Sequence, residues 1–97
     1  MENLKKSRTS KDVATAMRLP ASKAIEWQVR HQLTEQILGA VKKKEMSVTE
    51  VAKKAGTSRS RITLILKGET EGISIDVLLR VLGAVGKTVK LTFGKVS

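Results

Sequence analysis

The sequence predicts a small, mainly helical domain of four to five helices that ends in one β-strand. Three observations lead to this prediction. Apolar residues recur at steps of three and four along most of the chain, as they do on one face of a helix. Serines and glycines stand where such helices would begin and end. Only residues 88–93 alternate polar and apolar side chains with a period of two.

Length and composition exclude several classes of site. The chain has 97 residues, of which 40% are hydrophobic, so we expect one domain with a modest core. It has no cysteine and one histidine, which excludes disulfides, thiolate zinc sites and His-paired metal sites within one chain. With Trp27 and Phe93 as its aromatic residues, it has no base-stacking platform. We expect no metal and no cofactor.

The strongest compositional signal is positive charge. Nineteen Lys and Arg stand against nine Asp and Glu, which gives a net charge of +10. An excess this large on a small domain indicates a polyanionic partner: nucleic acid, an acidic membrane face or an acidic protein. No apolar run approaches the ~18 residues needed to span a bilayer, and the basic start lacks the apolar stretch of a secretory signal. These patterns favour nucleic acid as the partner and the cytoplasm as the location.

The chain divides into residues 1–20, a basic and partly disordered arm, and residues 21–97, the folded domain. Within the arm, Ser10 and Pro20 bracket a predicted short helix, Lys11 to Leu19. Ser22 is expected to cap the next helix, from about 23 to 44, whose apolar stripe is Ile25, Val29, Leu33, Ile37, Leu38 and Val41. On this helix, Trp27 is expected in the core or a dimer contact, and His31 as a packing residue rather than a metal ligand. Lys42, Lys43 and Lys44 are expected either to complement the helix dipole or to face phosphate.

Three shorter helices follow. Ser47, with Glu50 three residues later, marks the start of one that Gly56 ends. Thr57 restarts the chain, and the next helix, with its inner face at Ile62, Ile65 and Leu66, ends at Gly68. Ser74 caps the last helix, which ends at Gly86 and has the predicted buried stripe Leu78, Leu79, Leu82 and Val85.

Residues 48–68 contain the pattern that indicates function. Two short helices meet at Gly56, which supplies a left-handed turn, and Ala52 leaves room for the helices to cross closely. Ile62 and Ile65 would fix the second helix to the domain and leave its other face free for the DNA major groove. The surrounding segment, residues 47–68, carries five Lys and Arg and one Glu, more net charge than any other part of the chain.

This spacing resembles the helix-turn-helix of the lambda repressor-like (XRE, Cro/CI) family. The segment ISIDVLLRVLGAVGKTVKLTF, residues 73–93, is similar to the end of HigA-type and HipB-type antitoxins. The resemblance implies a bacterial or phage protein whose C-terminal strand pairs across a homodimer. The dimer contacts it implies are Leu78, Leu82, Val85, Val89, Leu91 and Phe93.

The resemblance also implies which residues contact a palindromic DNA operator. Arg59 is expected to read guanine, because a guanidinium can bind O6 and N7 together. Ser60 and Thr63 would contact bases or phosphates, and Leu64 either a thymine methyl or solvent. Arg61, Lys67, Thr49, Ser58 and Lys53 or Lys54 are expected at phosphates or on a solvated basic face.

The sequence therefore favours a DNA-binding repressor, in particular the antitoxin of a type II toxin–antitoxin operon that represses its own promoter and binds a toxin. A free-standing phage or bacterial regulator is the alternative within this class. An unspecific nucleoid or RNA-binding protein is less favoured, because such binding needs no shaped recognition helix. An enzyme is disfavoured, because the nine acids form no paired cluster.

Overall fold

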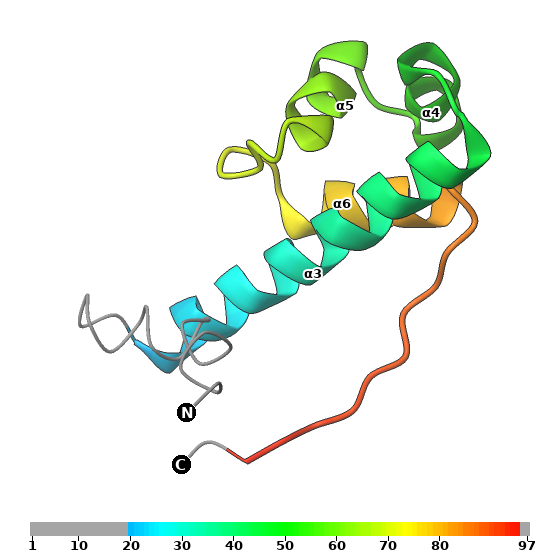
Figure 1. Ribbon diagram of the computed structural model, residues 1–97. Helices are drawn as coiled ribbons and strands as arrows, with labels where there is room; N and C mark the ends of the chain where they lie inside the picture. Colours follow the sequence, from blue (N-terminus) through cyan, green and yellow to red (C-terminus); the bar gives the residue numbers. More distant parts are fainter. Residues whose placement is uncertain (1–19, 96–97) are drawn as a thin grey trace, which may run out of the picture.

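Four helices make up the part of the chain that the computed structural model describes, residues 20–95 (Figure 1). They are α3 (Ala21–Lys44), α4 (Val48–Ala55), α5 (Arg59–Leu66) and α6 (Ile75–Ala84). Their order and approximate bounds confirm the four helices predicted for the folded domain. The helix predicted from Lys11 to Leu19 lies outside the described residues, as does the arm up to residue 19.

Three of the helices begin at a serine whose side chain caps them. The hydroxyls of Ser47, Ser58 and Ser74 each accept the backbone N–H three residues later, at 3.0, 3.1 and 3.2 Å. Two predicted starts need correction. Ser58, not Thr57, caps α5, and α3 begins one residue before Ser22, after an extended Pro20 without a side-chain cap.

The core lies where α5 and α6 pack against the C-terminal half of α3 and α4 packs against α5 and α6 (Figure 1). The N-terminal half of α3 projects beyond the bundle, so Ile25, predicted on the buried stripe, is 53% exposed. The buried hydrophobic residues come from every helix, from the loop before α6 and from the residue that follows α6. They are Leu33, Ile37, Ala40, Val41, Val51, Ala52, Ala55, Ile62, Ile65, Ile73, Val77, Leu78, Val81, Leu82 and Val85.

Helix α6 is the central element of this core and contacts both α3 and α4. Leu79, predicted in its buried stripe, is exposed, while Val77 and Val81 are buried. The reason is the helical period: positions 77, 78, 81, 82 and 85 share one face, and position 79 points away from it. Five apolar residues within 77–82 hid this face in the sequence.

After α6, residues 87–95 run back along α3 as an irregular segment that forms no strand within the described chain (Figure 1). Its alternating side chains Val89, Leu91 and Phe93 are 44%, 72% and 90% exposed. A strand needs a neighbour for its backbone hydrogen bonds, and the described part of one chain contains no other strand. Pairing with a second subunit stays a prediction.

Candidate nucleic-acid interface

Helices α4 and α5 form a helix-turn-helix around Gly56. This glycine adopts φ 68°, in the left-handed region. The turn is closed by hydrogen bonds from the Gly56 N–H to the Lys53 carbonyl (3.3 Å) and from the Thr57 N–H to the Ala52 carbonyl (3.1 Å). Ala52 is buried, and Ile62 is 1% exposed. The motif therefore has the glycine turn and the buried small residue that the sequence predicted.

The inner and outer faces of α5 differ completely. Ile62 and Ile65 lie in the core, at 1% and 0% exposure, so the opposite side of the eight-residue helix faces solvent. That side carries guanidinium, hydroxyl and apolar groups together. Its exposed residues are Arg59, Ser60, Thr63 and Leu64, followed by Lys67 beyond the last turn. The structure thus brings these sequence-predicted residues onto one surface.

The start of α5 concentrates positive potential. The first N–H groups of a helix have no intrahelical acceptor, and the macrodipole adds a partial positive charge there. Ser58 accepts one of these N–H groups, from Arg61, and retains its own hydroxyl proton for donation. Arg61 also donates from Nη1 to the Thr57 hydroxyl (3.4 Å), which directs its guanidinium toward the turn.

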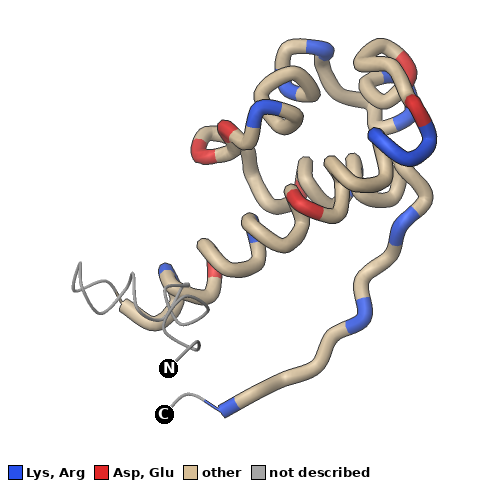
Figure 2. Tube along the Cα trace, in the orientation of Figure 1, with Lys and Arg blue, Asp and Glu red and all other residues tan. Residues whose placement is uncertain are grey.

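Helix α4 adds exposed polar and basic residues beside this surface. Thr49 lies in its first turn and is exposed, as are Lys53 and Lys54 near its end. Lys54 makes a loose ion pair with Glu50 at 3.9 Å. Figure 2 shows Lys and Arg on both helices of the motif, so an anion approaching α5 also meets the charges of α4.

A family model described as a helix-turn-helix domain matches residues 19–94, which span all four described helices. The chain belongs to this helix-turn-helix domain family. Membership indicates a DNA-binding regulator, and domains of this kind are typically not enzymes. No curated protein and no solved structure matches the chain.

Two cations outside α4 and α5 donate hydrogen bonds to backbone carbonyls. Lys44 donates from Nζ to the Val85 carbonyl at 2.7 Å, which joins the end of α3 to the end of α6. Arg30 donates to the carbonyls of Thr70 and Ile73. Sequence reasoning missed Arg30, although one signal was present: it lies three residues before the buried Leu33, on the core side of α3, where an arginine needs partners.

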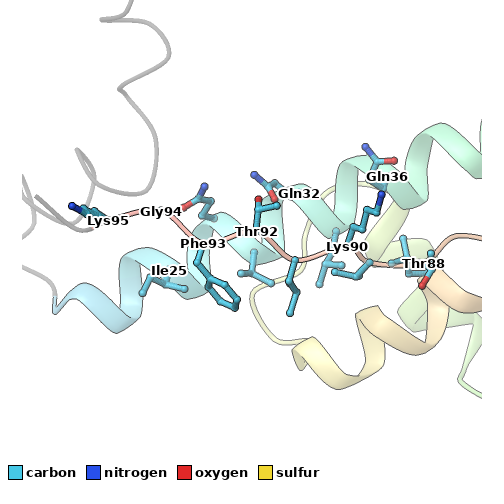
Figure 3. A pocket seen from close by; sticks show the side chains of 15 residues that line it. Ile25, Gln32, Gln36, Thr88, Lys90, Thr92, Phe93, Gly94 and Lys95 are labelled. Atoms are coloured by element: carbon cyan, nitrogen blue, oxygen red, sulfur yellow. The ribbon is translucent and has the colours of Figure 1, made fainter.

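The residues predicted to form the dimer fall into two groups. Leu78, Leu82 and Val85 are at most 3% exposed and belong to the core of their own helix-turn-helix domain, and Leu82 also lines the groove beside residues 88–95. Their contribution to a dimer stays a prediction. The other three, in residues 88–95, line a groove of about 710 Å³ against α3 (Figure 3). They remain exposed.

Trp27 and His31 are both exposed and do not line this groove. The prediction of a core position for Trp27 is therefore wrong. Their rings stack with centroids 5.3 Å apart, and His31 lies 3.3 Å from a Glu35 carboxylate oxygen. Within residues 20–95, no cluster of three His, Cys, Asp or Glu forms a metal site. No helix in the same range is long and apolar enough to cross a membrane.

Proposed function

We propose that the chain is a sequence-specific DNA-binding repressor in which α5 enters the major groove of a two-fold symmetric operator. The observation that carries the proposal is the outer face of α5. A core helix needs its inner residues Ile62 and Ile65, but folding does not require the guanidinium and hydroxyl groups on the opposite side. Such groups are the ones that read base edges.

Each exposed residue has a role that follows from its chemistry. Arg59, in the first turn of α5, bonds guanine O6 and N7, and Ser60 and Thr63 contact bases or phosphates. Leu64, 38% exposed, contacts a thymine methyl group. Charged or hydroxyl groups at the edges of the surface position the duplex through its phosphates. These are Thr49, Ser58, Arg61 and Lys67.

The operator and the role of Arg59 are tested together. Selection from a random duplex library identifies the preferred sequence, and footprinting should then show two half-sites about one helical turn, roughly 10 bp, apart. Arg59→Ala should weaken operator binding by about 1–3 kcal/mol and relax the preference at one position in each half-site. Arg80→Ala is the matched control, because it removes one exposed arginine from α6, outside the motif. Equal loss on random and operator DNA would support charge-driven, unspecific binding instead.

The repressor would act as a homodimer through residues 88–93. The alternating side chains and the exposed apolar residues Val89, Leu91 and Phe93 support pairing with the same segment of a second chain. Truncation after Gly86 should then give monomers that keep their helical circular dichroism and lose tight operator binding. A truncated protein that is still dimeric in sedimentation equilibrium would show that another surface forms the dimer.

The biological role proposed for this repressor is that of an antitoxin. The similarity of residues 73–93 to the ends of HigA-type and HipB-type antitoxins supports this role. The product of the neighbouring gene should arrest growth when expressed alone, and co-expression of this chain should restore growth. A neighbouring gene without toxicity would favour a free-standing regulator, with the DNA-binding surface unchanged.

A further inference from the structure

Arg30 joins two parts of the chain that are distant in sequence. Its Nη1 donates to the Thr70 carbonyl at 2.7 Å and also to the Ile73 carbonyl, 40 and 43 residues away. Its Nη2 lies 3.2 Å from a Glu26 carboxylate oxygen, and its Nε donates to the same oxygen at 3.3 Å. One guanidinium therefore binds α3 to the loop between α5 and α6.

The burial of this guanidinium limits the movement of the loop that it binds. The Arg30 side chain is only 19% exposed, and the two loop residues whose carbonyls it binds are buried, at 8% and 3% exposure. A charge in such a place is stabilised only when its donors are matched by well-placed acceptors. The planar fork of arginine supplies several donors in fixed directions. The loop can therefore shift only if these bonds break.

The same loop is bonded to the last turn of α5. The Gly68 N–H donates to the Ile65 carbonyl and the Glu69 N–H to the Leu64 carbonyl, both at 2.9 Å. The Ile73 N–H closes the loop by donating to the Thr70 carbonyl at 3.0 Å. Hydrogen bonds at the two ends of the loop, joined by the peptide bond between Glu69 and Thr70, thus connect Arg30 to Leu64, a residue of the exposed face of α5.

We propose that Arg30 is a positioning residue for DNA recognition, which sets the place of the C-terminal end of α5 through the loop 67–73. It touches no DNA itself. Without it, the core still fixes Ile62 and Ile65, but the end of α5 with Leu64 and Lys67 loses its second attachment. The inference rests on the proposed function, because it assigns a positioning role within the same interface.

The binding experiment uses the full chain and compares Arg30→Met with Arg30→Lys and Arg80→Met. Methionine keeps an apolar stem and removes all donors, lysine keeps the charge and part of the donors, and Arg80→Met removes the same charge from an exposed site paired with Asp76. Affinities for the selected operator and for random duplex are measured at a temperature at which circular dichroism shows every variant folded.

Arg30→Met should lower the ratio of operator to random affinity about tenfold, the size of one mismatched base pair. Arg30→Lys should recover part of that ratio, and Arg80→Met should leave it unchanged. A purely stabilising role would lower the melting temperature of Arg30→Met but not the ratio measured on folded protein. An unchanged ratio for Arg30→Met therefore overturns the proposal.

Amide hydrogen exchange on the free protein distinguishes a failure of this inference from a failure of the proposed function. Arg30→Met should speed exchange at least tenfold at the Glu69 and Ile73 amides, while the α4 amides keep their protection. Unchanged exchange at those two amides overturns the positioning role, whatever DNA binding shows. If wild-type protein prefers no sequence, the proposed function fails, and the exchange result alone decides whether Arg30 fixes the end of α5.

Discussion

Replacement of Gly86 by alanine should cost more stability than the same replacement at Gly56, because only Gly86 lies beside a lysine. Both glycines have positive φ, 86° and 68°. A Cβ on Gly56 would meet no atom within 4 Å, whereas a Cβ on Gly86 would collide with the Nζ of Lys44. That Nζ donates to the Val85 carbonyl at 2.7 Å, so alanine at position 86 displaces a hydrogen bond as well as straining the backbone.

The two contributions have separate magnitudes. A left-handed backbone costs a residue with a Cβ about 1–2 kcal/mol, and this is the whole expected loss for Gly56→Ala. Displacement of the flexible Lys44 side chain costs little by itself, but its lost hydrogen bond adds about 1 kcal/mol. Gly86→Ala should therefore lower the free energy of unfolding by about 2–3 kcal/mol. At about 4–8 °C per kcal/mol for a domain of this size, the two variants should differ by several degrees in melting temperature.

Urea unfolding of four proteins isolates the hydrogen bond: wild type, Gly86→Ala, Lys44→Met and the double variant. The double-mutant cycle should give a coupling of about 1 kcal/mol, because alanine at 86 has no bond left to displace once Lys44 is gone. Gly56→Ala combined with Lys44→Met should be additive, since the two sites share no contact. Additive losses for Gly86 and Lys44, with a Gly86→Ala cost equal to that of Gly56→Ala, would refute this reasoning.

Two further predictions concern single side chains. Ser58→Ala should lower the free energy of unfolding, measured by thermal unfolding, by about 1 kcal/mol, because the Arg61 N–H loses its acceptor. Ser22→Ala is the control and should change this free energy little, because Ser22 caps no helix. Equal effects of the two substitutions would contradict the assignment of Ser58 as the cap. The hydrogen bond from Arg30 and the charge of Lys23 hold the pKa of Glu26 below its ordinary 4.5. Because the pKa of Glu26 is lower in the folded than in the unfolded protein, its carboxylate stabilises the fold above pH 4.5. This stabilisation is lost as the pH falls through the pKa that Glu26 has in the folded protein. Glu26→Gln should therefore be less stable than wild type in urea at pH 7, and the difference should disappear in acid; a difference independent of pH would exclude the carboxylate as its source.

Local signals predicted most of the helical architecture. Ser47, Ser74 and Gly56 act within a few residues of their own positions, so caps and turns follow from sequence spacing. The outer face of α5 was also predictable, because Ile62 and Ile65 fix its orientation and leave a known opposite side.

The features that sequence did not predict depend on distant or missing neighbours. Arg30 binds carbonyls 40 and 43 residues away, and nothing near it in the chain indicates them. In α6, the run of consecutive apolar residues led to the prediction of Leu79 in the core, where the structure places Val81 instead. Residues 88–93 have the alternation of a strand, but residues 20–95 of one chain contain no second strand to pair with them.

The division of α5 into a buried and an exposed side has a consequence for how this protein changes over time. Ile62 and Ile65 hold the helix in place, while Ser60, Thr63 and Leu64 contribute little to the core. In the proposed function, substitutions on the exposed side would therefore redirect the protein to a different DNA sequence with little loss of folding stability. A lineage of such proteins would then acquire new targets by point mutation, and an engineer would retarget this one by randomising the exposed positions of a single eight-residue helix.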